Sequence, residues 1–264
     1  MKKAIFYTVI FLGIQFIIGS AMQLVWKFFD QDHTIASSTQ MIVMMAVFSA
    51  ITIALFLGLK WAVVSRRYVR SRPWAALFWC ALASVGAIIP SLWLQEQMPE
   101  LPNVLEQEFD MILRNRWGYF VVGLLAPVAE ELVFRGAILR ALLEWCQRLD
   151  SEKLRFLKNH WTMIAVSALL FALVHGNPAQ MPHAFVIGLL LGWMYWRTGS
   201  VVPGVVYHWV NNSLAYVLYN LYPSSSIKLV DIFGSTTHVL MAVGFSLLIL
   251  LPALFQLGER LKRA

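Results

Sequence analysis

Apolar residues gather into eight blocks along the chain, separated by short polar stretches. Most blocks run for about 20 residues, the length that a helix needs to cross the hydrocarbon core of a bilayer. Uninterrupted apolar runs of this length favour helices over strands. The pattern therefore predicts an all-α, polytopic membrane protein with about eight transmembrane helices. The blocks are Ala4–Trp26, Met41–Val64, Trp74–Leu94, Trp117–Trp145, Trp161–Val174, Met181–Trp196, Val201–Leu221 and His238–Leu257.

The composition supports this interpretation. Hydrophobic residues make up 59% of the 264 residues and charged residues only 13%, about half the share found in soluble domains. The net charge of +7 does not indicate nucleic-acid binding, because Lys and Arg lie in short clusters between the blocks rather than along one face. We therefore expect the lipid bilayer as a partner and no nucleic acid. Cys80 and Cys146 lie in or beside different predicted helices, which favours packing residues over a disulfide or thiolate metal site.

Basic residues also predict the orientation in the membrane. Their clusters fall in alternate connections, at residues 66–72, 148–158, 197 and 260–263. Opposite connections are acidic or polar, above all residues 96–110. Cytoplasmic loops carry an excess of Lys and Arg, so both termini are expected in the cytoplasm. The compact loops fit a multi-pass protein of the cell membrane, specifically a bacterial inner membrane.

Three ionisable residues interrupt the fourth block, which contains Glu130, Glu131 and Arg135. A charge at bilayer depth costs roughly 3 kcal/mol or more, so such residues usually mark a functional site. Glu131 and Arg135 are four residues apart and share one helix face, where they can pair, while Glu130 points about 100° away. One carboxylate is thus expected to be structural and the other chemical. The alternative is that both glutamates pair with arginines and hold helices together.

Two later blocks add polar groups at membrane depth. His175 ends an apolar run, where a lone histidine is more often a packing residue than a catalytic one. His208 and Asn212 share a helix face, whereas Asn211 is expected to turn away. Taken alone, these could form an interhelical polar clamp. His183, near the start of another block, is expected to lie outside the site.

The three elements together indicate hydrolysis. They supply a carboxylate that can take a proton from water, imidazoles, and an amide that can donate to a developing oxyanion. The polar residues Glu130, Glu131, His175, His208 and Asn212 are therefore the candidate catalytic group, with Arg135 as the partner of a structural ion pair.

The motifs Glu130-Glu131-x-x-x-Arg135, Phe171-x-x-x-His175 and His208-x-x-x-Asn212 resemble those of the intramembrane CAAX-type proteases and bacteriocin-processing enzymes, the Abi or CPBP family. The stretch from Gly188 to Asn212 is also similar. This resemblance divides the chain into N-terminal helices with an amphipathic segment at 1–116, a protease-like core at 117–221, and a C-terminal helix at 222–264. The amphipathic segment, around residues 105–116, has helical spacing of its apolar residues, which fits either a helix on the outer membrane interface or a solvated helical linker.

The resemblance implies an endopeptidase acting on a protein or peptide substrate at the membrane, either a lipidated CAAX-like protein or a peptide precursor. It implies that Glu130 and His175 activate water, and that His208 and Asn212 stabilise the oxyanion. The family is often labelled metalloprotease, and Glu130, His175 and His208 could supply a zinc-type ligand set. No His-Glu-x-x-His helix is present, so water activation by the carboxylate without a metal is the other alternative.

Two other functions compete with proteolysis. A non-catalytic bacteriocin-immunity or scaffold protein could keep the polar cluster to bind a peptide or to join helices. A proton-coupled transporter could use buried Glu and His as a relay. Against a transporter, the sequence shows no internal repeat, and all the motifs lie in one half of the chain.

Overall fold

The computed structural model describes residues 1–29, 37–148, 158–222 and 227–262, and this part of the chain contains helices and connections without a strand. Each of the eight apolar blocks forms a helix, so the predicted all-α class is confirmed. The helices are α1 (Lys2–Phe29), α2 (Ser38–Gly58), α4 (Trp74–Glu96), the continuous helix of η1 (Phe120–Leu125), α6 (Ala126–Glu131), η2 (Leu132–Leu139) and α7 (Arg140–Gln147), then α8 (His160–Leu173), α9 (Met181–Thr198), α10 (Val202–Leu221) and α12 (Thr236–Arg260).

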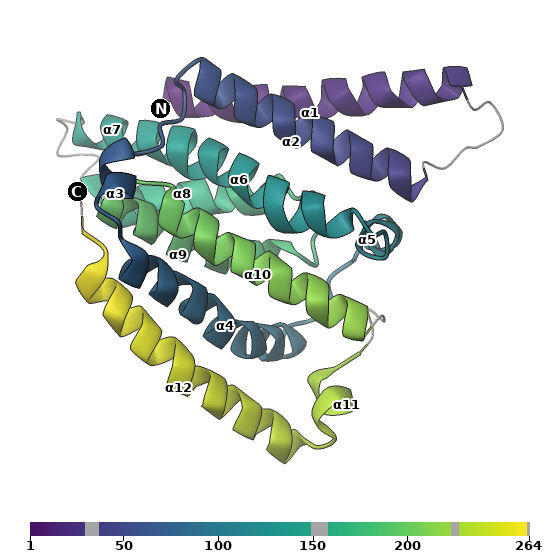
Figure 1. Cartoon of the computed structure of the whole chain (residues 1–264), viewed down its shortest axis with the longest axis vertical. Coiled ribbons are helices and arrows are strands. Elements are labelled where there is room, and N and C mark those ends of the chain that lie inside the picture. Colours follow the sequence, from purple (N-terminus) through teal and green to yellow (C-terminus); the bar gives the residue numbers. More distant parts are fainter. Residues whose placement is uncertain (30–36, 149–157, 223–226, 263–264) are drawn as a thin grey trace.

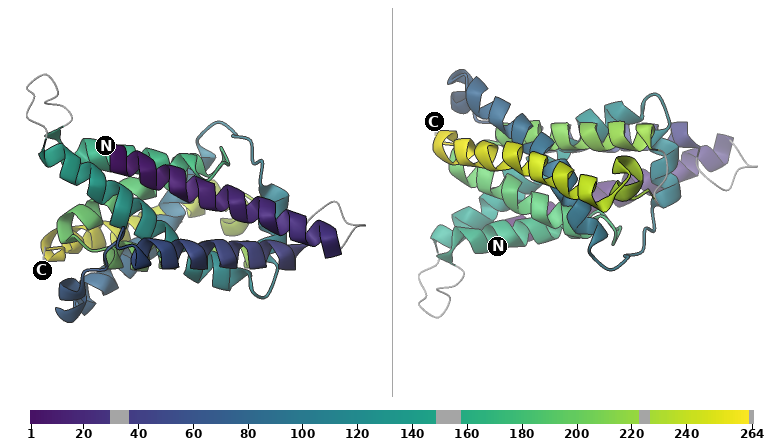
Figure 2. Two further views of the ribbon diagram at one scale, coloured as in Figure 1. Left: turned by 90° about the horizontal axis from the view of Figure 1, so that it is seen from above. Right: turned by 90° about the horizontal axis from the view of Figure 1, so that it is seen from below.

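The long helices run side by side in alternating directions (Figure 1). Both termini and the short helix α3 (Arg66–Arg70) lie at one end of the bundle, and the short helices α5 (Glu106–Leu113) and α11 (Leu229–Phe233) lie at the other. The views from above and below agree with this arrangement (Figure 2). The basic connections around 66–72, 197 and 260–262 thus share one end, and the acidic segment 96–110 lies at the opposite end. Residues 149–157 of the basic cluster at 148–158 are outside the described residues.

Four helices of the described chain are long and apolar enough to cross a membrane: Lys2–Phe28, Ser38–Gly58, Trp74–Glu96 and Thr236–Arg260. The helix α8 is apolar but shorter. This finding, together with the apolar exteriors of these helices, identifies a membrane protein. The polar motifs lie on the continuous helix from η1 to α7, on α8 with the turn after it, and on α10, which pack among the other helices.

Small residues allow the helices to approach closely. A Cβ added at Gly188 of α9 would lie 2.8 Å from the Cβ of Ala168 in α8, and one at Gly86 of α4 would lie 2.6 Å from the backbone nitrogen of Leu250 in α12. Such contacts between small residues are the usual way in which helices associate in lipid. Between α8 and α9 the chain turns at Gly176, whose φ of 63° suits a residue without a Cβ.

Candidate active site

The two glutamates lie on a helix that departs from regular α geometry on both sides of them. The segments η1 and η2 are π-helical and flank α6, which ends at Glu131. π-helical turns are rare and often occur at functional sites. Glu130 and Glu131 are adjacent in the α-helical segment between η1 and η2, so their side chains point about 100° apart and meet different surroundings.

Glu131 is enclosed by the protein. Its Oε1 atom lies 2.7 Å from Nη1 of Arg135, and the two side chains are 0% and 1% exposed. Arg135 also donates from Nη2 to the Gly188 carbonyl at 3.3 Å, and its guanidinium lies 4.4 Å from the centre of the Phe171 ring. A charge pair with these additional contacts locks α6 and η2 against α8 and α9.

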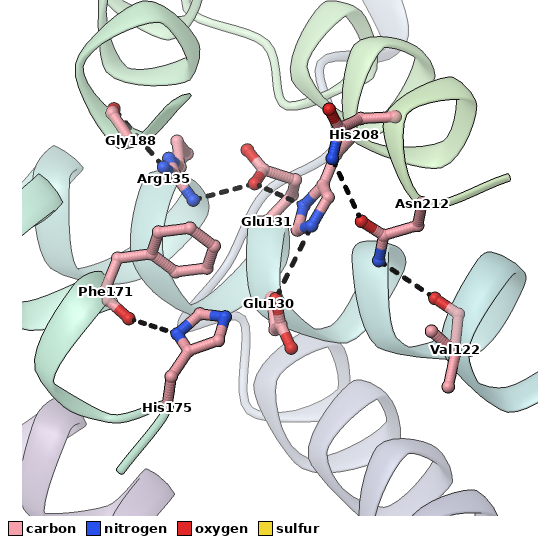
Figure 3. A network of polar contacts seen from close by, with 10 residues as sticks. Val122, Glu130, Glu131, Arg135, Phe171, His175, Gly188, His208 and Asn212 are labelled. Atoms are coloured by element: carbon pink, nitrogen blue, oxygen red, sulfur yellow. Dashed lines mark hydrogen bonds and ion pairs between the residues drawn. The ribbon is translucent and has the colours of Figure 1, made fainter. Parts of the chain in front are cut away.

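Glu130 faces a different environment. Its side chain is 24% exposed, and Oε2 lies 3.8 Å from Nε2 of His208. The other ring nitrogen of His208, Nδ1, lies 3.2 Å from Oε1 of Glu131. An ionised carboxylate only accepts hydrogen bonds, so Nδ1 carries the proton and donates to Glu131. His208 therefore bridges the enclosed carboxylate and the accessible one, as Figure 3 shows.

His175 is oriented by a backbone group. Its Nδ1 atom lies 2.7 Å from the Phe171 carbonyl, which can only accept, so Nδ1 donates and a neutral ring has its lone pair on Nε2. In Figure 3 this second nitrogen points toward Glu130. The turn after His175 is fixed by the buried Asn177, which donates to Oδ1 of Asn103 at 2.8 Å and accepts from the Val104 backbone at 3.1 Å.

Asn212 makes a contact that the sequence did not predict. Its Nδ2 donates to the Val122 carbonyl in η1 at 3.0 Å, and its Oδ1 accepts from Nδ2 of Asn211 at 3.4 Å. One of its amide N–H bonds is thus already used in the structure. The amide joins α10 to η1 within the same cavity wall that carries Glu130.

A cavity of about 360 Å³ collects the accessible members of the group. Its wall includes Glu130, His175, His208 and Asn212, whereas Glu131 and Arg135 lie behind it. The helix α5 closes one side with Phe109 and Leu113. At this wall, His208 of the 20-residue α10 meets Glu130 of the long helix from Phe120 to Gln147.

Residues 113–214 match the family model of the Type II CAAX prenyl endopeptidase Rce1-like proteins. The resemblance to CAAX-type proteases is thereby confirmed. The matched segment contains every candidate residue from Glu130 to Asn212. A curated relative, the UPF0177 protein YxdF of Lactococcus lactis subsp. lactis (strain IL1403), is 27% identical over 115 residues. That match covers 43% of this chain and 52% of the relative, so it spans about half of the relative's length. No solved structure gives a significant match.

Two residues that were not expected at the site from the sequence lie in the wall of the cavity that contains Glu130. His183 and Asn211 line both this cavity and a neighbouring apolar one of about 380 Å³ between α4, α9, α10 and α12. Asn211 was expected to turn away from His208 and Asn212, but it lines the same cavity as these two residues. His183 was detectable as a polar residue within an apolar block. Its Nδ1 atom lies 2.6 Å from Oγ of Ser91 in α4.

The ligand set that the sequence suggested for a metal is Glu130, His175 and His208, which would suit zinc by ligand type. Among the described residues, no three His, Cys, Asp or Glu side chains are grouped closely enough to hold an ion. Glu130, His175 and His208 share the cavity wall, and Nδ1 of each histidine faces an oxygen of the protein, the arrangement that orients metal-bound histidines. The three side chains are nevertheless not grouped closely enough around one point, so as placed they do not fit a tetrahedral zinc site.

Proposed function

We propose that this protein is an intramembrane endopeptidase of the CAAX-protease type in which Glu130 activates water. The observation that carries this proposal is the separation of the two carboxylates. Glu131 is neutralised by Arg135 and enclosed, while Glu130 lies in the cavity wall with His175 and His208. Of the two carboxylates, only Glu130 lines the cavity, where it can exchange a proton with a water molecule, the task of a general base.

In the proposed reaction, the proton taken from water is returned to the leaving amine, so no further proton donor or acceptor is needed. Glu130 accepts a proton from water while the hydroxyl attacks the peptide carbonyl, and Nε2 of His175 accepts a hydrogen bond from the same water. A protonated His208, held by Glu131, donates from Nε2 to the oxyanion. Glu130 then gives its proton to the leaving amine as the C–N bond breaks. Glu131 thus acts by orienting the His208 ring through Nδ1.

The substrate is proposed to be a protein or peptide at the membrane, either a lipidated CAAX-like protein or a peptide precursor. The cavity lies among helices with apolar surfaces, and α5 covers it on the acidic side of the bundle. A segment of chain that enters from the bilayer would meet Glu130 without crossing a soluble domain.

We also infer that the basic end of the bundle, with both termini, faces the cytoplasm. Fusions of a reporter that is active only in the cytoplasm test this orientation. Activity is expected for a fusion at the C-terminus and not for one in the α10–α12 connection. The reverse pattern would contradict the inference.

A comparison of peptide termini tests the activity. Membranes and medium are collected from cells with wild-type protein, Glu130→Ala, or Glu144→Ala, a half-exposed glutamate on the same helix, at equal expression. We expect a precursor with one consistent cut site to accumulate only with Glu130→Ala. Normal processing by Glu130→Ala would refute the assignment. Function retained by Glu130→Gln would instead favour the non-catalytic immunity or scaffold protein.

A further inference from the structure

The Val122 carbonyl in η1 lacks a donor from its own helix at the two usual positions. The backbone N–H of Ala126, four residues on, bonds to the Val121 carbonyl instead. Five residues on, where a π-helical donor would stand, is Pro127, which has no N–H. The proline ring also crowds the carbonyl four residues before it, which favours the wider winding of η1.

The side chain of Asn212 supplies the missing donor. Its Nδ2 atom lies 3.0 Å from the Val122 carbonyl oxygen, with the amide oriented further by Asn211. Backbone carbonyls away from water are almost always paired, because an unpaired one loses the hydrogen bond it had in water. The amide of α10 thus completes the hydrogen bonding of a helix that it does not belong to.

A second contact ties the same two segments. The hydroxyl of Tyr119, just before η1, accepts a hydrogen bond from Nε1 of Trp209 at 3.0 Å and lies 3.0 Å from Oγ of Ser213. With the Asn212 bond, α10 holds η1 at two points about one turn apart. Pro127 lies three residues before Glu130. The π-helical winding of η1, which the contacts with α10 hold in place, therefore sets the direction of the Glu130 side chain.

We propose that Asn212 is a positioning residue, whose amide replaces the N–H that Pro127 lacks and thereby holds η1 so that Glu130 faces the cavity. Its effect on cleavage rests on the proposed function, but its link to Pro127 does not. An oxyanion donor at this position, the role that the family resemblance implies, would act independently of Pro127.

A double-mutant cycle on thermal unfolding tests the link. Asn212→Leu in purified protein is expected to lower Tm by roughly 2–6 °C, the shift for one lost buried hydrogen bond in a chain of this size. In a Pro127→Ala background, where residue 127 has an N–H within reach of Val122, the same substitution should lower Tm much less. Equal losses in both backgrounds would overturn the proposal.

A matched control comes from the second π-helical segment. Ser167 donates from Oγ to the Phe134 carbonyl at 3.0 Å, but five residues after Phe134 is Leu139, which has an N–H. Ser167→Ala is therefore expected to cost the same in both the wild-type and Pro127→Ala backgrounds. A smaller cost of Ser167→Ala in the Pro127→Ala background would mean that Pro127→Ala stabilises η1 and η2 in general. The support for a specific link between Asn212 and Pro127 would then be removed.

Cleavage of the precursor found by the comparison of termini separates positioning from chemistry. Asn212→Leu is expected to lower kcat on the order of 100-fold with little change in KM, the effect of a displaced base. The double variant should recover most of this loss relative to Pro127→Ala. A double variant that regains its Tm but not its kcat would make Asn212 an oxyanion donor and overturn the positioning role. If the wild-type protein cleaves nothing, the proposed function fails while the Tm cycle still decides the link.

Discussion

The Oε1 atom of Glu131 and the Nη1 atom of Arg135 lie 2.7 Å apart in an ion pair that has almost no exposed surface. Removal of one partner would leave the other charge buried alone. Arg135→Met is therefore expected to lower the free energy of unfolding by about 3–5 kcal/mol. Thermal unfolding of the purified protein measures this loss.

The matched control for Arg135→Met is Arg260→Met, at the exposed end of α12. That change should cost less than about 1 kcal/mol. Replacing both members of the buried pair, as Glu131→Leu with Arg135→Met, should restore part of the loss, because neither charge remains. A double variant less stable than Arg135→Met would contradict the ion-pair explanation.

The two neighbouring glutamates should respond differently to the same change. Glu130→Gln removes the charge of a partly exposed side chain, so Tm is expected to stay near the wild-type value while cleavage falls on the order of 100-fold or more. Glu131→Gln leaves Arg135 without its partner and should lower Tm by several degrees. Parallel measurement of Tm and cleavage separates the roles, and a stable Glu131→Gln with an unstable Glu130→Gln would reverse them.

Gly204 gives α10 the room to carry His208 past Glu131. A Cβ at this position would lie 2.7 Å from Oε2 of Glu131, so either the Glu131 carboxylate or α10 would have to shift. Gly204→Ala is expected to reduce both Tm and cleavage. Gly244→Ala in α12, where nothing lies within 4 Å of the added Cβ, should be neutral or slightly stabilising. Similar behaviour of the two variants would show that the close approach is unimportant.

Acid should weaken the attachment of α5, which covers the cavity. The Tyr219 hydroxyl, together with Arg114, holds the pKa of Asp110 below its usual value. The ionised carboxylate therefore adds stability above pH about 4, and this contribution is lost as the pH falls through the lowered pKa. Tyr219→Phe should reduce the acid-induced fall in Tm, which thermal unfolding at several pH values measures. Tyr216→Phe, one turn earlier on α10, should keep the wild-type acid dependence.

The sequence alone was sufficient to predict where the long helices lie and that Glu130 and Glu131 have different surroundings. Apolar blocks marked each long helix, and helical spacing separated Glu131, which meets Arg135, from Glu130, which lines the cavity. These are local relations within one helix, and periodicity describes them well.

Relations between helices were beyond the reach of spacing. The bond from Asn212 to Val122 depends on the π-helical winding near Pro127, which no periodic pattern reveals. Asn211 was set aside because it does not share the helix face of His208 and Asn212, and His183 because it lies near the start of a block, yet both line this cavity and the neighbouring one. The donor to a carbonyl freed by proline can come from any neighbouring helix, so only the packed structure identifies it.

The helices that are apolar enough to cross a membrane by themselves, α1, α2, α4 and α12, contribute no residue to the Glu131, Arg135 and His208 contacts. The helix with both glutamates is poorly suited to cross a membrane alone, because Arg135 pairs only with Glu131 within this helix and both glutamates also contact His208 of the later helix α10. We expect its stable integration to wait until α10 has been synthesised. Chains truncated before His208 should therefore leave this helix extractable from the membrane, whereas α2 should already be retained.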